Sequence, residues 1–296
     1  MTKQERQIFT REFKRDAVRL SETSGRTTEQ IEQIAEDLGY EDSSKFFDRA
    51  PRFDFEKVCP CFNRAQAMSD LRPIDPPKSQ EFDDLYFSAD DGLAESKFVF
   101  LDGNKLPENW LEAERFVICE TGFGTGLNFL SAWKLFEETT KPHQALDFIS
   151  FEKYPLEAEK IGLYLQPWLN FFDGRLQQLI AHYPPGIPGF HRVALNERVT
   201  LTLIFDDVNE AIPKLIADVD AWFLDGFKPA TNPDMWSDTV IENMARLSRK
   251  GTRLATFTAA GKVRRSLIAA GFSIEKVPGF GRKRDMTIGY LAGDRA

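Results

Sequence analysis

A glycine-rich turn with the sequence ETGFGTGLN, at residues 120–128, constrains this chain more than any other segment. An apolar run at 116–119 precedes it, and the stretch after it predicts a helix over 127–138, so the local order is strand, turn, helix. Glycines let the backbone approach a ligand closely, and the N-terminus of a following helix offers free N–H groups. The segment therefore predicts a ligand site at the end of a strand.

The acidic residue that ends this strand, Glu120, distinguishes between two classes of ligand. A carboxylate repels the diphosphate of a dinucleotide, whereas it attracts a sulfonium cation that carries a free amino group. We therefore expect S-adenosylmethionine (SAM) to be the cofactor, and a dinucleotide-dependent oxidoreductase is the alternative. The residues of the turn that are expected to hold SAM are Glu120, Gly122, Gly124, Gly126 and Asn128.

Strand and helix patterns alternate from residue 116 to the end of the chain. This alternation predicts an α/β fold with a doubly wound, mostly parallel sheet and right-handed crossovers. The last two strands are separated only by 278–284, too short for a crossover helix, so they should form an antiparallel hairpin. Such a sheet is the seven-stranded architecture of class I methyltransferases. We expect strands at 116–119, 146–151, 199–205, 220–224, 252–257, 272–277 and 286–291, and helices at 127–138, 156–165, 174–182, 208–217, 234–248 and 260–270.

The N-terminal part, residues 1–69, has the pattern of a separate helical extension. Two amphipathic segments in it, 11–24 and 28–38, resemble helix-turn-helix pieces of insertion-sequence transposases and of AraC-type proteins. The alternative is a fused remnant, a disordered extension or an over-extended gene start, for which Met68 offers an internal start. Three prolines then predict a linker to a domain over 70–296, in which 86–88 and 97–101 are expected to be strands. These prolines are Pro73, Pro76 and Pro77.

The composition excludes some classes of function. The 38 basic and 46 acidic side chains give a net charge of −8, which argues against indiscriminate binding of nucleic acid. Apolar runs fall short of the roughly 18 residues that a membrane span requires, and the first residues lack the apolar region typical of a signal peptide, so we expect a cytoplasmic protein without membrane contact. The three cysteines fit a reducing compartment. Because the C-x-C pair Cys59 and Cys61 has no second pair, no metal site is expected.

Basic residues nevertheless gather in one window, 246–284, in which Glu275 is the only acid. A basic region on an acidic protein can attract a polyanion to one face. The alternative is a solvated helix face followed by a charged hairpin. On the first interpretation, Arg282 and Arg284 in the hairpin loop would contact the phosphate backbone of a nucleic-acid substrate.

Acidic side chains also follow three other predicted strands: Glu152, then Asp206 and Asp207, then Asp225. Ligands of a doubly wound sheet bind outside the carboxyl ends of its strands, so these acids should meet at one edge. Glu152 is placed to accept the ribose hydroxyls of SAM, and either Asp206 or Asp207 the adenine amino group. Glu120 would take the methionine ammonium, directly or through water. The alternative for each acid is a structural role, because the edge of a sheet is wet.

The last of these acids begins a proline-rich loop with the sequence DGFKPATNPDMW, at 225–236. Asp225 would face the methyl-transfer zone, where a carboxylate can take a proton from an amine nucleophile or hold its ammonium. Aromatic side chains on such a loop can stack on a flat base, and the alternative is a hydrophobic lid packed on the helix 234–248. The predicted substrate-binding residues of the loop are Phe227, Lys228, Pro229, Asn232 and Trp236.

Several motifs together resemble the methyltransferase half of the MnmC family, the bifunctional tRNA 5-methylaminomethyl-2-thiouridine biosynthesis proteins. These motifs are GFGTGLNF, FEK, LDGFKPATNPDMW, LATFTAAGKVRR and GFGRKRDM, in the order of the family and within about residues 80–292. The resemblance implies methyl transfer from SAM to the primary amine of 5-aminomethyl-2-thiouridine at the tRNA wobble position. It also implies that Asp225 is the catalytic acid/base residue, and that the glycine turn, Glu152 and Asp207 hold SAM.

The sequence departs from the bifunctional members of that family in two respects. Those members continue into an FAD-dependent oxidase, whereas this sequence ends at Ala296, so no FAD is expected in this chain. The expected partners are therefore tRNA and either a separate FAD-dependent oxidase or the upstream wobble-uridine modification enzymes. Residues 1–69 have no counterpart in the family. The alternatives are a SAM methyltransferase acting on a small amine or a protein, and a DNA-binding protein built on the N-terminal helices.

Overall fold

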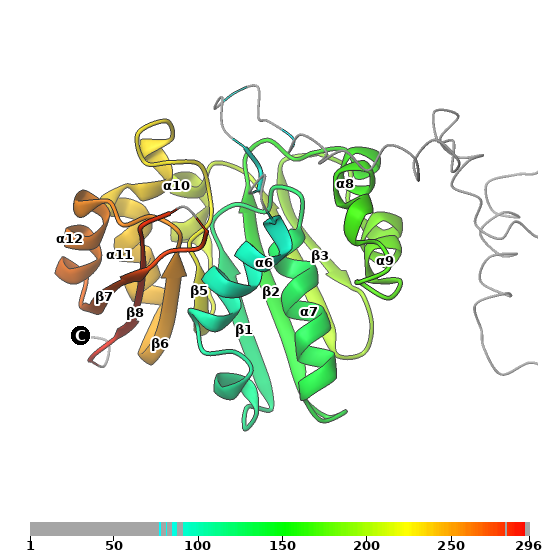
Figure 1. The fold of residues 1–296 in the computed structure, drawn as a ribbon, viewed down its shortest axis with the longest axis horizontal. Coiled ribbons are helices and arrows are strands. Elements are labelled where there is room, and N and C mark those ends of the chain that lie inside the picture. Colours follow the sequence, from blue (N-terminus) through cyan, green and yellow to red (C-terminus); the bar gives the residue numbers. More distant parts are fainter. Residues whose placement is uncertain (1–76, 78–80, 82–84, 88–90, 282, 294–296) are drawn as a thin grey trace, which may run out of the picture. The chain divides into compact units, whose positions relative to one another are not determined.

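The computed structural model describes residues 77, 81, 85–87, 91–281 and 283–293 of the chain (Figure 1). The helix-turn-helix-like segments within 1–69, the prolines Pro73 and Pro76, and Arg282 lie outside the described residues. Those expectations, together with the domain boundary at residue 69, stay predictions.

The described residues fold around one mixed sheet of eight strands in the order β3-β4-β2-β1-β5-β6-β8-β7. The five central strands, β4 to β6 in that order, run parallel, and β8 and β7 complete the sheet as an antiparallel hairpin. This arrangement confirms the predicted fold class and the terminal hairpin. The strands are β1 Arg115–Glu120, β2 Ala145–Glu152, β3 Gly189–Ala194, β4 Val199–Phe205, β5 Val219–Phe223, β6 Ser248–Thr256, β7 Phe272–Pro278 and β8 Asp285–Leu291.

The eighth strand, β3, corrects the predicted number of seven. It pairs antiparallel with β4, with Gly189 opposite Phe205 and Ala194 opposite Thr200. Half-buried and exposed positions alternate along it, as expected for an edge strand that covers the core with one face. Its sequence, GFHRVA, contains no continuous apolar run, so the strand gives only a weak signal before its partner is known.

Two hydrophobic cores lie on the two faces of the sheet, because successive side chains of a strand point to opposite faces. In β1, Ile118 packs in the core that α7, α8 and α9 cover, and its neighbour Cys119 packs in the core that α10, α11 and α12 cover. Figure 1 looks onto the face covered by α6 and α7. The helices are α6 Gly92–Ser96, α7 Leu127–Thr139, α8 Ala158–Leu165, α9 Arg175–His182, α10 Val208–Ala211, α11 Asp238–Leu247 and α12 Gly261–Ala269.

The segment before β1 is helical, which corrects the strand predicted over 97–101. Asp91 caps α6 by accepting a hydrogen bond from the N–H group of Ala94 at 3.0 Å, and the chain continues as a π-helical segment, Lys97–Asp102. Phe100 of this segment stacks on Phe223 of β5, with 5.4 Å between the ring centroids. A short apolar run suits a buried helix as well as a buried strand, so its composition could not decide between them. Residues 86 and 87, also predicted as strand, lie outside any strand.

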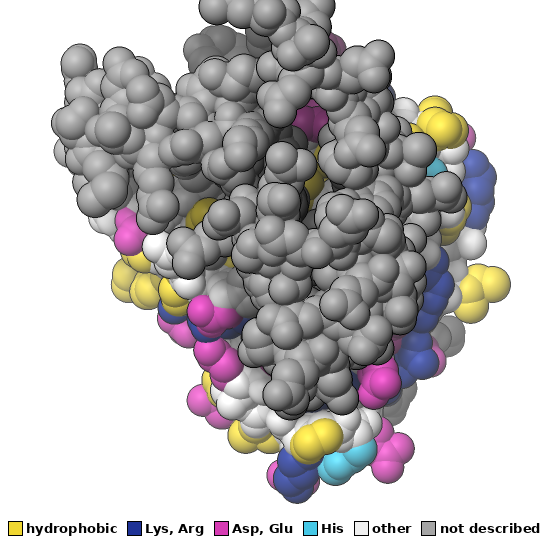
Figure 2. Space-filling model, turned by 90° about the vertical axis from the view of Figure 1, so that its right-hand side faces the viewer, with side chains coloured by type: hydrophobic (Ala, Val, Ile, Leu, Met, Phe, Trp, Pro, Cys, Tyr) yellow, Lys and Arg dark blue, Asp and Glu magenta, His cyan; other side chains and the backbone are white. Residues whose placement is uncertain are grey.

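The surface mixes charged and apolar side chains. On the face shown in Figure 2, acidic, basic and hydrophobic side chains are all visible along the margin. The exposed apolar residues include Leu163, Ile187 and Phe190. Scattered exposure of this kind is normal for a folded protein. Within the described part of the chain, every helix is too short or too polar to cross a membrane.

Candidate active site

The glycine turn connects β1 to α7 as the sequence predicts, and its glycines are there for two different reasons. Gly126 precedes α7 with φ at 78°, and a Cβ atom at this position would lie 2.7 Å from Cζ of Phe123. Gly122 faces the neighbouring strand end, where a Cβ atom would lie 3.3 Å from the carbonyl oxygen of Asp225. The turn thus needs a left-handed residue at one position and close backbone packing at the other.

A cavity of about 590 Å³ opens beside this turn, at the carboxyl ends of the parallel strands. Most of the predicted site residues line it, which places them where ligands of doubly wound sheets bind. The predicted residues in its wall are Gly122, Gly124, Asn128, Glu152, Asp206, Asp207, Asp225, Phe227, Lys228 and Asn232. Five others that the structure describes lie outside the wall: Glu120, Gly126, Pro229, Trp236 and Arg284.

Asn128, on the first turn of α7, connects the polar groups behind this wall. Its Nδ2 group donates to Oε1 of Glu120 at 2.9 Å and to Oδ2 of Asp225 at 2.7 Å. Its Oδ1 atom accepts a hydrogen bond from Oγ of Ser96 at 2.6 Å. Both amide hydrogens are therefore used on carboxyl groups, and the hydroxyl of Ser96 fixes which way the amide points.

Glu120 lies behind Asn128 and is fully buried. Oγ of Ser150 donates to its Oε2 atom at 2.7 Å, so both carboxyl oxygens have a partner. Burial, with the nearby charge of Asp225, raises the pKa of Glu120 well above its usual value. Glu120 does not line the cavity, whereas Asn128, which donates to it, does, and the predicted contact of Glu120 with the methionine ammonium of SAM stays a prediction.

Asp225 lies at the end of β5 and lines the cavity. Its Oδ1 atom accepts a hydrogen bond from the N–H group of Gly226 at 2.8 Å, and its carbonyl oxygen accepts one from Oγ1 of Thr121 at 2.6 Å. Burial raises the pKa of Asp225 to about 6, against the opposing effect of the donors to its carboxylate. The structure therefore holds, at the predicted catalytic position, a carboxyl group whose pKa is raised to about 6.

Glu152, at the end of β2, is tied to the glycine turn. Its Oε2 atom accepts a hydrogen bond from the N–H group of Gly124 at 2.9 Å, and its Oε1 atom accepts one from the N–H group of Tyr154 at 2.8 Å. Burial raises its pKa, and the backbone donors partly offset that effect. Each carboxylate oxygen has a second lone pair, so these contacts leave room for the ribose hydroxyls of the predicted role.

The two acidic residues after β4 differ in how many local hydrogen bonds and ion pairs they make. Asp207 caps α10 by accepting from the N–H group of Asn209 at 2.9 Å, and its other oxygen pairs with Nζ of Lys153 at 2.8 Å. Although burial acts to raise its pKa, these donors lower it below the usual value. Asp206 lines the same cavity and accepts at Oδ1 from the N–H group of Asp207. Of the two alternatives for the adenine amino group, Asp206 is the less committed to local structure.

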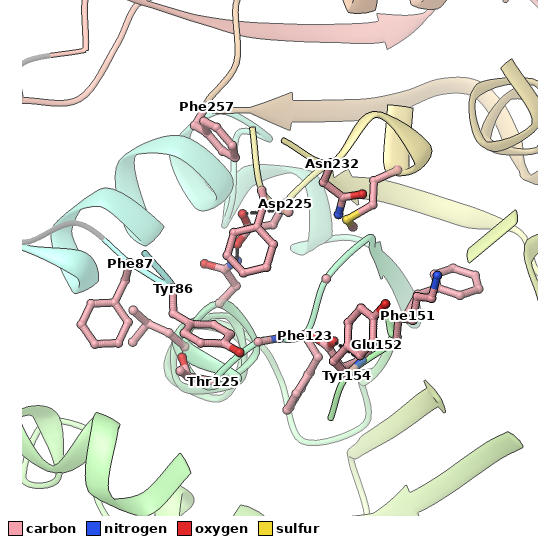
Figure 3. A pocket seen from close by; sticks show the side chains of 18 of the residues that line it. Tyr86, Phe87, Phe123, Thr125, Phe151, Glu152, Tyr154, Asp225, Asn232 and Phe257 are labelled. Atoms are coloured by element: carbon pink, nitrogen blue, oxygen red, sulfur yellow. Dashed lines mark hydrogen bonds between the residues drawn. The ribbon is translucent and has the colours of Figure 1, made fainter. Parts of the chain in front are cut away.

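Aromatic side chains form part of the cavity wall (Figure 3). Phe227, on the loop after β5, meets Tyr86 edge to face, with 5.7 Å between the ring centroids. Trp236 is 7% exposed and donates through Nε1 to the carbonyl oxygen of Phe227 at 3.3 Å. The loop thus offers Phe227 to a ligand, whereas Trp236 anchors the loop from behind, as in the hydrophobic-lid alternative.

The predicted basic window does not form a single face. Arg246, on α11, donates to the carbonyl oxygens of Ile212 and Leu215 at 3.0 and 3.1 Å, so it ties α11 to the segment that follows α10. Arg249 pairs with Asp220 near the start of β5, at the sheet edge opposite the cavity. Within the described part of this window, only the hairpin loop between β7 and β8 places a basic side chain in the cavity wall. Arg284, in the same loop, lies outside the cavity wall, and 93% of its side chain is exposed to solvent.

Some cavity residues are absent from the sequence prediction. Glu95 and Ser96 come from α6, which the prediction places beside a strand, and Phe257 and Lys283 come from the ends of β6 and the hairpin. The acid-capped pattern DDGLAES at 90–96 is a helix-start signal that would have placed Glu95 and Ser96 on a helix. Phe257 lies at the end of a parallel strand, the same signal that identified the acids.

Comparisons with known proteins indicate the class of the protein. Residues 171–292 match the family described as S-adenosyl-L-methionine-dependent methyltransferase. A crystal structure of MnmC2 from Aquifex aeolicus superposes with a TM-score of 0.57 at 22% identity, over 73% of this chain and 66% of that chain, and supports the fold. The sheet, its glycine turn and the family match together define the chain as a SAM-dependent methyltransferase.

Curated relatives narrow the class. The tRNA 5-methylaminomethyl-2-thiouridine biosynthesis bifunctional protein MnmC of Aliivibrio fischeri is 48% identical over 229 residues, which are 73% of this chain and 33% of that protein. The MnmC protein of Cupriavidus metallidurans is 47% identical over 231 residues, 75% of this chain and 34% of that protein. The resemblance to the methyltransferase half of MnmC is thus confirmed over about three quarters of this chain. The chain spans about a third of the length of these curated relatives.

The residues present fit SAM. Gly122 and Gly124 line the cavity, and because they have no side chain the backbone there is open to a ligand. Acidic side chains outnumber basic ones in the cavity wall, which suits a cofactor with a positively charged sulfur. Glu152, Asp206 and the glycine turn would hold the ribose, the adenine and the methionine part.

Proposed function

We propose that the protein transfers a methyl group from SAM to the amine of 5-aminomethyl-2-thiouridine at the wobble position of tRNA. The MnmC relatives, whose names place them in the biosynthesis of 5-methylaminomethyl-2-thiouridine, support this substrate. The aromatic wall of the cavity, with Phe227 and Tyr86, supports a flat base as the acceptor. Asp225, between the glycine turn and that wall, is the proposed catalytic residue.

SAM supplies an electrophilic methyl group whose bond to sulfur breaks with its electron pair remaining on sulfur, while the amine nitrogen uses its lone pair for the new bond. The amine must reach this step without its extra proton. Asp225 can take that proton, because a carboxyl group with a pKa of about 6 is a better base than an ordinary aspartate. Asn128 holds Oδ2 of Asp225 in place at 2.7 Å, so the base is positioned before the substrate arrives.

The observation that carries this proposal is the carboxyl group of Asp225, which Asn128 holds in the cavity beside the glycine turn and whose pKa is raised to about 6. The test is transfer of a labelled methyl group from SAM to tRNA that bears 5-aminomethyl-2-thiouridine. tRNA with unmodified wobble uridine is the matched control substrate, and Asp225→Asn is the matched control enzyme. Label on the modified tRNA alone supports the proposal, and equal labelling of both tRNAs contradicts it.

A SAM methyltransferase of small amines or proteins is the second candidate. The acidic cavity wall favours it as much as it favours an aminomethyl base, because both acceptors arrive as cations. Competition between aminomethyl-tRNA and simple primary amines for labelled methyl groups separates the two functions. A dinucleotide-dependent oxidoreductase, the alternative raised by the glycine turn, does not fit the methyltransferase family match.

The proposed setting is the cytoplasm, where tRNA is modified. We propose that an FAD-dependent oxidase is a partner that supplies the aminomethyl group, because the matched relatives are named as bifunctional biosynthesis proteins of this modification. The upstream wobble-uridine modification enzymes would prepare the substrate of that oxidase. Co-purification of the tagged protein with such enzymes would support these partners.

A further inference from the structure

Lys283 reaches the cavity from the loop of the β7–β8 hairpin, and nothing in the proposed chemistry uses it. Its Nζ atom lies 2.6 Å from Oε1 of Glu95 and 4.5 Å from the centroid of the Phe257 ring. The three residues come from different elements, α6, the end of β6 and the hairpin, and all three line the cavity. A cation is therefore held at the cavity wall by an acid and an aromatic face.

This cation lies close to the proposed catalytic residue. The charges of Glu95 and Lys283 both act on Asp225, in opposite directions. In Figure 3, Phe257 lies on the side of Asp225 away from Glu152, the proposed ribose ligand of SAM. Lys283 thus belongs to the part of the cavity that remains for the methyl acceptor, rather than to the part that holds the ribose.

The ion pair between Lys283 and Glu95 is suited to exchange. The Lys283 side chain is 45% exposed, so it can turn to another anion, while Glu95 is 12% exposed and stays in the wall. A methyl acceptor that carries both an ammonium and an anionic group can replace the ion pair between Lys283 and Glu95 by two new ion pairs, one with each of these residues. The ammonium would take the place of Lys283 beside Glu95 and Asp225, and the anionic group would take Lys283.

We propose that Lys283 binds a backbone phosphate of the nucleotide that receives the methyl group, and leaves Glu95 when that nucleotide enters. The inference rests on the proposed function, because it requires the acceptor to be a nucleotide within an RNA chain. The neighbouring Arg284 has an exposed guanidinium group, so the loop carries two basic side chains that can contact successive phosphates of an RNA chain. This supports a backbone phosphate, rather than a free small anion, as the ligand of Lys283. The carboxylate of SAM is the other anion that could reach a lysine here.

The test is a double-mutant cycle between Lys283 and single phosphates of the substrate. The RNA is an anticodon stem-loop with 5-aminomethyl-2-thiouridine at the wobble position, and a methylphosphonate replaces the phosphate on its 5′ or 3′ side. Lys283→Gln and wild type are compared on the intact and substituted RNAs, by kcat/KM and by the dissociation constant of the RNA. Lys276→Gln is the matched control, since Lys276 lies on the same hairpin, pairs with Asp285 at 3.0 Å and is absent from the cavity wall.

We expect Lys283→Gln to lower kcat/KM on the intact RNA by roughly tenfold or more, the scale of a hydrogen bond between charged groups. On the RNA that lacks the contacted phosphate, the same substitution should have little further effect, whereas Lys276→Gln should act equally on both RNAs. Lys283→Arg should keep most of the activity. Thermal melting checks that Lys283→Gln is folded, and loss of one partly exposed ion pair should leave the fold intact.

Additive effects of Lys283→Gln and of both methylphosphonates would overturn the inference. So would a loss of SAM affinity in Lys283→Gln measured by calorimetry, because the anion would then be the SAM carboxylate. The RNA dissociation constants report the contact even without methyl transfer. An RNA that binds with the expected non-additivity but is never methylated would therefore overturn the proposed function and keep the phosphate contact.

Discussion

Replacing Asp225 by asparagine should make the free protein more stable at neutral pH, while it removes the proposed catalytic base. The pKa of Asp225 is raised from 3.8 to about 6, chiefly by burial. A carboxyl group whose folded-state pKa is raised contributes stability that is present below pH 3.8 and is lost as the pH rises through about 6. The amide side chain of the Asp225→Asn variant cannot ionise, so the variant avoids that loss.

The magnitude follows from the shift. Each pKa unit corresponds to about 1.36 kcal/mol, so the ionised carboxylate costs the folded protein about 3 kcal/mol above pH 6. The two oxygens of Asp225 accept from Gly226 and Asn128, and an amide has only one acceptor oxygen, so the variant loses one bond worth about 1 kcal/mol. The net gain should be about 2 kcal/mol at pH 8. At pH 5 the stability gain of Asp225→Asn should be smaller by about 1.4 kcal/mol, because the wild type has not yet lost all of the stability that ionisation of Asp225 removes.

Urea unfolding of wild type and Asp225→Asn at pH 5 and pH 8, without SAM, measures both values. Asp206→Asn is the control, because Asp206 lines the same cavity, but its carboxyl group does not share a side-chain amide donor with a second carboxyl group. A stability difference between Asp225→Asn and wild type that is independent of pH would refute the raised pKa. Near-normal turnover by Asp225→Asn, where a loss of roughly 10²–10⁴-fold is expected, would refute the catalytic assignment.

Three further predictions concern the cofactor, the polar cluster and the tRNA. Glu152→Ala should weaken SAM binding by about 1–3 kcal/mol in calorimetry, and unchanged affinity would remove Glu152 from the ribose role. Asn128→Ala should lower the free energy of unfolding by about 2–4 kcal/mol, because it leaves a buried and a half-buried carboxyl group without their shared donor; an effect no larger than that of Ser96→Ala would contradict this. Arg282→Ala with Arg284→Ala should raise the KM for tRNA and reduce its salt dependence, with SAM affinity unchanged.

The sequence predicted the parallel part of the fold well, because its strands carry strong local signals. β1, β2, β4 and β5 are apolar runs that end in acids, and each lies within a residue or two of its predicted bounds. The segment 97–102 and β3 were missed for the same physical reason. Their conformation depends on what they pack against, the π-helical segment on Phe223 and the edge strand on β4. Neither contact is visible in a local pattern.

The strand-end rule also located most of the cavity, since Glu152, Asp206 and Asp225 follow directly from it. The rule gives the position of a residue along a strand but not the direction or depth of its side chain. It therefore could not show that Glu120 lies behind Asn128, or that Asp207 caps α10. The sequence predicted the basic hairpin loop that contains Lys283, but not the place of Lys283 in the cavity wall. That place depends on contacts with Glu95 and Phe257, which are distant in sequence.

The pairing of Glu120 and Asp225 through one amide leads to a last prediction. The buried Glu120 and the half-buried Asp225 share the Nδ2 group of Asn128, and the charge of Asp225 disfavours the ionisation of Glu120. A cation placed in the cavity favours the ionised form of a carboxyl group. The positive sulfur of SAM should therefore lower the pKa of Asp225 and release up to about half a proton at pH 6, where Asp225 is half protonated. Calorimetry of SAM binding in buffers of different ionisation enthalpy counts these protons. S-adenosylhomocysteine, whose sulfur is neutral, should release fewer, and Asp225→Asn should abolish the difference between the two ligands. Equal proton release by both ligands in the wild type would show that Asp225 does not sense the sulfonium charge, and it would have to lie farther from the methyl-transfer zone than the proposed mechanism requires.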